Sequence, residues 1–301
     1  MVLVFRCHTW QDDAENLVPC VVSPCSAHHG LLLLDKAAGT FAVRRVDVVF
    51  PVLHGKNGED GTVQGLLTLA GIPYVGCDTY ASAVCMNKIA TKRLCAGLGI
   101  SMAASVELTA GPDFDMNAAV CAAVEKLGSP VFVKPANAGS SVGITKARSR
   151  AELIAGIEKA FENDRLVLME EAVVGREVEV AVLGGERDFV SECGEIAPNS
   201  DFYDYETKYI SDVAEYYIPA RLRPETAEII RGTARRIFRA LGCTGLSRVD
   251  FFVTADETVY FNEINTLPGF TAISMYPQLM RRSGLTYAEL IDRLVEDACR
   301  R

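Results

Sequence analysis

Two short segments near the C-terminal end constrain the fold more than any other part of the sequence. They read LSRVDFF (residues 246–252) and VYFNEIN (residues 259–265), and a polar stretch separates them. Two strand-like segments on either side of a short polar loop predict a β-hairpin. A loop centred on Asp256 and Glu257 sets the register of the two strands.

The expected register places four polar side chains on one face of this hairpin. Asp250 is opposite Glu263, and Arg248 is opposite Asn265. Side chains two apart on a strand point to the same face, so the other face is apolar. That face carries Val249, Phe251 and Ile264.

The polar face of the hairpin is a candidate metal site. Two carboxylates directly opposed repel each other unless a cation lies between them. Hard oxygen ligands at this spacing suit Mg²⁺, which takes one or two carboxylates and completes its shell with phosphates and water. The alternative is a surface hairpin with solvated charges, but the specialised turn NTLPG (residues 265–269) that follows favours a functional site.

A second candidate site is the segment KPANAGSSVG (residues 134–143). A lysine at the end of an apolar strand, followed by a Gly/Ser loop, can hold a phosphate through its charge and backbone N–H groups. A plain connecting loop is the alternative. The chain contains neither a Walker P-loop nor a G-x-G-x-x-G motif, which argues against those two nucleotide-binding folds.

Two further loops are candidates for binding. HGKNGEDG (residues 54–61) follows an expected buried strand over residues 46–53, and loops at strand carboxyl ends form binding crevices. A structural histidine is the alternative there. FYDYETKYISD (residues 202–212) contains three tyrosines and is expected to close over a ligand, with an ordinary solvated connection as the alternative.

Strand and helix patterns alternate along the chain, which is typical of an α/β protein. Strands are expected at residues 46–53, 72–76, 131–134, 166–170 and 177–183. Helices are expected at residues 64–70, 81–98, 117–127 and 225–241, and after the capping residues Ser149 and Thr286.

Composition narrows the possible functions. A net charge of −9 and a pI near 5.1 argue against electrostatic binding to nucleic acid or to anionic membranes. No apolar stretch is long enough for a membrane span, and the N-terminus does not resemble a signal peptide. The ten cysteines include no C-x-x-C pair and show no metal-ligand spacing with the histidines. We therefore expect reduced thiols in a cytoplasmic protein.

Five motifs in this order resemble the D-alanine–D-alanine ligase family of ATP-grasp enzymes. The resemblance runs from about residue 46 to the C-terminus. The motifs are HGKNGEDGTVQGLL, VFVKPANAGSSVGI, FYDYETKYISD, LSRVDFF and FNEINTLPGFTAISMYP.

The resemblance implies α/β and α+β architecture: an ATP-grasp fold with a truncated N-terminal α/β (pre-ATP-grasp) domain. The expected domains are residues 1–85, the central subdomain 86–177 and the C-terminal subdomain 178–301. The family begins with a Gly-Gly-x-Ser-x-Glu segment whose Glu anchors the first D-alanine, and nothing similar precedes His54. Asn87 replaces the family's usual Asp. The chain as written is expected to bind Mg-ATP but to ligate D-alanine poorly.

The resemblance also implies a role for individual residues. The nucleotide would be bound by Lys88, Lys134, Ser141 and Lys208. Its adenine would be contacted by Glu170 and Val173, and its ribose by Glu177. Asp250, Glu263 and Asn265 would hold two Mg²⁺ ions, with Mn²⁺ as a substitute. Arg248 and the Gly269 amide would form the oxyanion site, and Ser140, Lys208 and Tyr209 would join the closing loop to the glycine-rich loop. His54 and Glu59 would bind the first D-alanine, and Ser274 and Met275 the second amino acid.

The implied reaction is ATP-dependent formation of D-alanyl-D-alanine through D-alanyl phosphate, for peptidoglycan precursor synthesis. Ligation of D-alanine to D-serine is the alternative within the family, and D-lactate is disfavoured because Tyr209 is present. A truncated nucleotide-binding remnant is the alternative from another class. A homodimer is expected if the N-terminal domain is intact.

Overall fold

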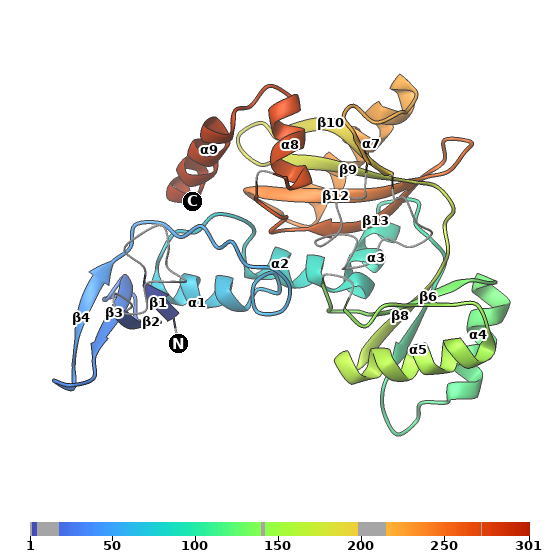
Figure 1. The fold of residues 1–301 in the computed structure, drawn as a ribbon, viewed down its shortest axis with the longest axis horizontal. Helices are drawn as coiled ribbons and strands as arrows, with labels where there is room; N and C mark the ends of the chain where they lie inside the picture. Colours follow the sequence, from blue (N-terminus) through green and yellow to red (C-terminus); the bar gives the residue numbers. More distant parts are fainter. Residues whose placement is uncertain (1, 5–17, 140–141, 198–214, 272) are drawn as a thin grey trace.

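Three antiparallel sheets organise the described part of the chain in the computed structural model, which covers residues 2–4, 18–139, 142–197, 215–271 and 273–301. Figure 1 shows the N-terminal sheet at one end of the molecule and the two others toward the opposite end. None of the helices in these ranges has the length and apolar character needed to span a bilayer.

The N-terminal sheet is a simple antiparallel meander. Its strands are paired in the order β1-β2-β3-β4: β1 (Val2–Val4), β2 (Val18–Val22), β3 (Gly30–Asp35) and β4 (Thr40–Arg45). Three helices lead from it toward the centre of the molecule: α1 (Thr62–Ala70), α2 (Thr79–Met86) and α3 (Lys88–Gly97).

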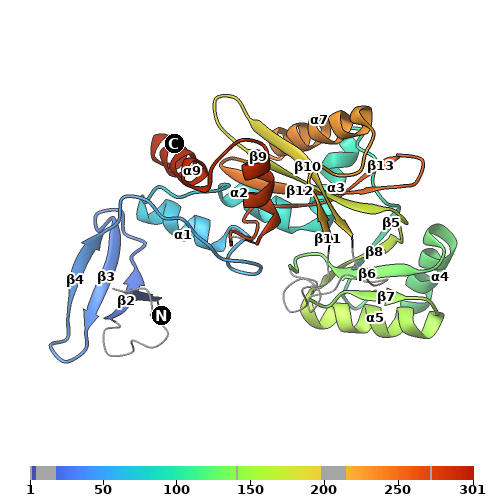
Figure 2. The same ribbon diagram turned by 45° about the horizontal axis from the view of Figure 1, so that its top comes forward.

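The smaller C-terminal sheet has the order β5-β8-β6-β7. Its strands are β5 (Ser105–Thr109), β6 (Val131–Pro135), β7 (Thr145–Ala147) and β8 (Leu166–Glu171). The helices α4 (Met116–Leu127) and α5 (Arg150–Asn163) pack on one face through a continuous apolar cluster. Figure 2 shows α5 on the side that faces away from the larger sheet, so the opposite face of the small sheet is turned inward.

The larger sheet has the order β11-β10-β9-β12-β13. Its strands are β9 (Arg176–Leu183), β10 (Phe189–Ala197), β11 (Glu215–Tyr217), β12 (Leu246–Val253) and β13 (Val259–Asn265). The helix α7 (Pro224–Ala240) covers one face, while α8 (Met275–Arg282) and α9 (Tyr287–Arg300) cover part of the other. The uncovered part of that second face is where a ligand can enter.

The prediction of a buried strand at residues 46–53 is wrong. Only Val49 pairs, in a single parallel bridge with Tyr74, so the expected strand at 72–76 is also reduced to this bridge. Val49 donates to the carbonyl of Pro73 and accepts from Val75, both at 2.9 Å. The next donor in a parallel ladder would be residue 51, which is a proline without an N–H group. The ladder therefore stops after one residue.

The expected helix at residues 81–98 is two helices. Asn87 is extended (ψ 101°), ends α2, and accepts a hydrogen bond from the backbone N–H of Ala90 at 2.9 Å. Asparagine is a favoured N-cap, so it starts a new helix rather than continuing the old one. As a consequence, Lys88 is the first residue of α3 and lies at its N-terminus.

Candidate active site

One large cavity, of about 1320 Å³, lies between the two C-terminal sheets. It contains almost all of the described residues that the sequence predicts for the site. Its lining includes His54, Glu59, Lys88, Lys134, Glu170, Val173, Glu177, Arg248, Glu263, Asn265, Gly269, Ser274 and Met275. The predicted metal ligand Asp250, which is 1% exposed, does not line the cavity itself, but both of its paired neighbours, Glu179 and Glu263, do.

The predicted register of the C-terminal hairpin is confirmed at the end far from the turn, over residues 248–250 and 263–265. Asp250 is paired with Glu263, and Arg248 with Asn265. The expected loop centre is slightly wrong, because Val253 pairs with Val259 and the turn is therefore centred on Asp256. A β-bulge between these two regions adds one residue to β13 and restores the expected pairing.

The bulge also decides which side chains of β13 face the cavity. Phe261 and Ile264 both belong to the apolar core under α7, although they lie three positions apart in the strand. A regular strand would place them on opposite faces. The extra residue reverses the alternation, so that Phe261 packs against Phe251 in the core while Glu263 and Asn265 share the opposite face with Asp250 and Arg248.

Three carboxylates lie in a row across the floor of the cavity. Asp250 of β12 is paired with Glu179 of β9 on one side and with Glu263 of β13 on the other. Arg248 binds Asp250 through Nε at 2.8 Å and Nη2 at 2.7 Å, and its Nε lies 3.1 Å from Glu179 Oε2. Lys88 lies 3.5 Å from Glu263. Protein cations therefore already occupy part of the space between the opposed acids.

This cluster keeps Arg248 charged. Burial by itself lowers the pKa of the guanidinium, but the carboxylates of Asp250, Glu179 and Glu263 outweigh it and raise that pKa well above its ordinary value. A permanently charged group at the floor of a cavity is suited to stabilising negative charge on a bound ligand.

The side-chain donors at the hairpin fit a divalent metal ion that is also coordinated by oxygen atoms of a bound ligand. Asp250 and Glu263 carry hard oxygen donors on one face, although Arg248 binds both oxygens of Asp250 in this structure. Asn265 donates its Nδ2 to Asp250 at 3.0 Å, which leaves its Oδ1 for another partner. Within the described residues, no group of three or more His, Cys, Asp or Glu side chains is placed to hold a metal ion. A metal here would therefore need Asn265 and ligand oxygens to complete its shell.

Two lysines face the cavity from different elements. Lys88 begins α3 and donates to the carbonyl of Ala138 at 2.9 Å, which ties it to the glycine-rich loop. Lys134 of β6 forms an ion pair with Glu170 of β8 at 2.7 Å. Both side chains are mostly buried yet line the cavity, so they can meet an anionic ligand there.

Glu170 is held between two cations. Lys134 contacts its Oε2, and Lys92 of α3 contacts its Oε1. Burial by itself raises the pKa of Glu170, but the two ammonium groups outweigh it and lower that pKa to about 2. The carboxylate is therefore charged throughout the physiological range.

A low pKa in the folded state makes Glu170 a source of pH-dependent stability. Its pKa is 4.5 as a free side chain and about 2 here, so unfolding takes up a proton between these values. We expect the wild type to exceed Glu170→Gln in unfolding free energy by on the order of 3 kcal/mol at pH 7. The difference should shrink as the pH falls from about 4.5 toward 2. Urea unfolding of both proteins across this range measures it, and a pH-independent difference would contradict the assignment.

The loop at residues 54–61 packs against two other parts of the site. The Nδ1 of His54 donates to the carbonyl of Leu267 at 3.0 Å, which anchors the loop to the turn after β13. Glu59 accepts from the backbone N–H of Gly55 at 2.6 Å. Burial raises the pKa of Glu59, and this effect exceeds those of the Gly55 hydrogen bond and His54. A Cβ on Gly139 would lie 3.3 Å from Gly55 Cα, so the glycine-rich loop approaches closely.

The turn after β13 closes the far side of the cavity. A Cβ on Gly269 would lie 2.8 Å from Ser274 Oγ, so a larger residue here would require the Ser274 side chain to move. Ser274 precedes α8 and accepts from the backbone N–H of Thr271 at 3.0 Å. Met275 is largely buried against the core under α8, and it lines the cavity only in part.

Some predictions lie outside the described residues. These are Ser140, Ser141, Lys208 and Tyr209, together with the expected closing segment at residues 202–212. Conversely, sequence reasoning missed Lys92 and Glu179. Both had a signal, because Lys92 is one helical turn after Lys88 and Glu179 shares the strand face of Glu177.

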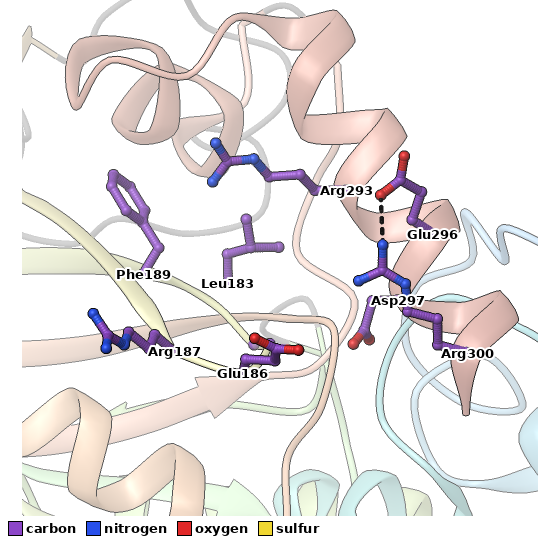
Figure 3. A pocket seen from close by; sticks show the side chains of 10 residues that line it. Leu183, Glu186, Arg187, Phe189, Arg293, Glu296, Asp297 and Arg300 are labelled. Atoms are coloured by element: carbon purple, nitrogen blue, oxygen red, sulfur yellow. Dashed lines mark hydrogen bonds and ion pairs between the residues drawn. The ribbon is translucent and has the colours of Figure 1, made fainter.

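A second, smaller cavity lies apart from this site. Figure 3 shows its lining between the hairpin that joins β9 to β10 and the helix α9, where Arg300 contacts Glu296 at 3.1 Å. The other charged residues of the lining are Glu186, Arg187, Arg293 and Asp297. Its volume is about 400 Å³, and none of the residues predicted for the site lines it.

Comparison with known proteins identifies the family. The family model described as D-ala D-ala ligase C-terminus matches residues 94–296, and the model of the N-terminus of the same ligases matches residues 10–77. The chain belongs to the D-alanine–D-alanine ligase family. The match to the C-terminal model includes the hairpin, both sheets that enclose the cavity and the turn at Gly269.

Individual relatives agree with this family. The D-alanine–D-alanine ligase of Caldicellulosiruptor bescii is 49% identical over 92% of this chain and 76% of its own length. D-alanine–D-alanine ligase A of Escherichia coli K12 is 49% identical over 85% of this chain and 70% of its own length.

Solved structures show the same fold. The VanG D-Ala:D-Ser ligase from Enterococcus faecalis superposes with a TM-score of 0.85 at 45% identity, covering 96% of this chain and 82% of that one. D-alanyl-alanine synthetase A from Vibrio cholerae superposes with a TM-score of 0.84 at 34% identity, covering 95% and 84%. The two C-terminal sheets are therefore those of the ATP-grasp fold of this ligase family.

Proposed function

We propose that this D-alanine–D-alanine ligase family member joins two D-alanine molecules at the expense of ATP, with the cavity between the C-terminal sheets as its active site. One observation carries the residue assignment. The cavity brings together the cations Lys88 and Lys134 and the hairpin carboxylate Glu263, with Lys88 lying 3.5 Å from Glu263. This arrangement suits a polyphosphate bound together with divalent metal.

ATP would bind along the inner face of the small sheet. Lys88 and Lys134 would contact its phosphates, while Glu170 and Val173 would lie near adenine and Glu177 near ribose. Asp250, Glu263 and Asn265 would hold Mg²⁺, as two ions that Mn²⁺ can replace. When bound, the metal neutralises charge on the phosphates during transfer.

The reaction would proceed in two steps on the cavity floor. The carboxylate of the first D-alanine, bound near His54 and Glu59, takes the terminal phosphoryl group of ATP and becomes an acyl phosphate, and ADP is the leaving group. The neutral amine of the second amino acid, near Ser274 and Met275, then attacks the acyl carbon, expels phosphate and gives up a proton as the amide forms. Arg248 and the N–H of Gly269 would stabilise the oxyanion that forms.

D-serine is a second candidate for the acceptor amino acid. The observation that favours it is the 45% identity with the VanG D-Ala:D-Ser ligase over 96% of this chain. We expect D-alanyl-D-alanine to be the main product when both amino acids are supplied in equal amounts. Mass spectrometry of the dipeptides decides between the two acceptors, and a predominance of D-alanyl-D-serine would make D-serine the preferred one.

The activity itself is tested by ADP release. Adding D-alanine to the protein with Mg-ATP should start steady ADP release matched by an equal amount of dipeptide, and L-alanine is the control. A chain that binds Mg-ATP but forms no dipeptide would instead be a nucleotide-binding protein without ligase activity.

The cellular setting follows from the same proposal. The product would serve peptidoglycan precursor synthesis in the cytoplasm, where ATP is available. We propose a homodimer as the working form, and light scattering on the purified chain tests it. A monomer that retains full activity would show that dimerisation is not needed.

A further inference from the structure

Lys92 is a buried cation beside the active site that the roles above do not use. Its side chain is 11% exposed, and its Nζ donates to the carbonyl of Ala103 at 2.9 Å. Its other partner is Oε1 of Glu170. A buried ammonium group needs such partners, because removing it from water is costly. Lys92 does not line the cavity, so it can act on a ligand only through other residues.

Glu170 connects Lys92 to the cavity. Its second oxygen, Oε2, is 2.7 Å from the Nζ of Lys134, which does line the cavity. A carboxylate bound to Lys134 competes with a ligand phosphate for the same ammonium group. With Lys92 on the other oxygen, the three side chains carry two positive charges and one negative charge. The group as a whole therefore stays cationic toward the cavity.

Lys92 also connects the two lysines that face the cavity. It lies one helical turn after Lys88 on α3, so both side chains project from the same side of that helix. Its pairing with Glu170 joins α3 to β8, the strand beside β6 on which Lys134 lies. The ion pairs on Glu170 thus link Lys134 to α3, the helix that also carries Lys88.

We propose that Lys92 is a positioning residue for the nucleotide phosphates: it offsets the charge of Glu170 and so leaves Lys134 able to bind phosphate. This inference rests on the proposed ATP-binding function. It predicts that changing Lys92 weakens the binding of the nucleotide's phosphates but not of its nucleoside part. A merely structural role would not separate these two affinities.

The test compares the affinities of the purified chain for ATP and for adenosine, measured by calorimetry or by competition. Removing one buried charge in Lys92→Met should weaken ATP binding by about 10- to 100-fold and adenosine binding by less than about twofold. In activity assays, the KM for ATP should rise while the KM for D-alanine is unchanged. Lys92→Arg should restore most of the ATP affinity because it keeps the charge.

Arg93 supplies a matched control. It is the next residue of α3, it carries the same charge, and it pairs with Glu107 on the surface. Arg93→Met should leave both affinities unchanged. If it weakens ATP binding as much as Lys92→Met does, the effect reflects overall charge and the proposal is wrong.

Two variants at Glu170 keep the proposal testable even if Lys92→Met does not fold. In Glu170→Gln the competitor for Lys134 is neutral, so the ratio of ATP affinity to adenosine affinity should rise above that of the wild type. The double variant Lys92→Met/Glu170→Gln should return this ratio to near the wild-type value. A ratio that falls in Glu170→Gln, or that is unchanged in Lys92→Met, would overturn the role of Lys92. A wild-type chain that binds no ATP would overturn the proposed function as well.

Discussion

Glu263→Gln is expected to lower kcat by about 100- to 1000-fold while leaving the thermal unfolding temperature nearly unchanged. Gln keeps the size of the side chain and one oxygen donor, so the pairing of β12 with β13 is retained. The charge that would bind divalent metal is lost, and with it the neutralisation of the phosphates during transfer. Steady-state ADP release, with calorimetric melting of the same samples, measures both quantities.

The control for this variant is Glu192→Gln. Glu192 is an exposed carboxylate on β10 of the same sheet, and it does not line the cavity. It should retain full activity. Titration with Mg²⁺ separates the causes further, because loss of a metal ligand raises the Mg²⁺ concentration needed for half-maximal rate. A variant with wild-type Mg²⁺ dependence and less than threefold loss would show that Glu263 is not a metal ligand.

Arg248→Met is expected to abolish ligation and also to destabilise the fold. Asp250 and Glu179 are both nearly fully buried, and Arg248 contacts both. Removing the cation leaves opposed carboxylates in a buried setting, which costs about 3–5 kcal/mol in other proteins. The kcat should fall by about 1000-fold or more, because a charged donor for the oxyanion is lost as well.

Arg248→Lys separates these two effects. It keeps the positive charge, so most of the unfolding free energy measured in urea should return. It lacks the planar guanidinium that binds Asp250 through two nitrogens, so activity should return only in part. Full activity in Arg248→Lys would contradict a geometric role, and a fully stable Arg248→Met would contradict the charge argument.

Much of the candidate site was predictable because it depends on local patterns. The alternation of residues along β12 and β13 predicted that Asp250, Glu263, Arg248 and Asn265 would share a face, and their pairing is as expected. The spacing of apolar residues in the sequence of β13 also indicates the bulge. Apolar residues at 261 and 264 cannot face the same core in a regular strand, so their spacing indicates an extra residue.

Errors occurred where a residue acts through backbone hydrogen bonds rather than through hydrophobicity. The apolar run at residues 46–53 suggested a buried strand, but Pro51 cannot donate the bond that would extend the ladder. The continuous helical pattern at 81–98 was interrupted because Asn87 caps the second helix. In both places a single residue outweighed the apolar pattern around it.

The sequence by itself determined the hairpin, the helices with clear caps, and the types of residue available for chemistry. These depend on neighbours within a few positions, for which period and propensity are reliable guides. Only the tertiary structure decided that Lys92 of α3 and Lys134 of β6 share the carboxylate of Glu170, and that Glu179 joins Asp250 and Glu263 in one row. Such contacts join segments far apart in the chain, and their geometry depends on how whole sheets and helices pack. No local pattern contains that information, because the same side chains would be solvated if the elements packed differently.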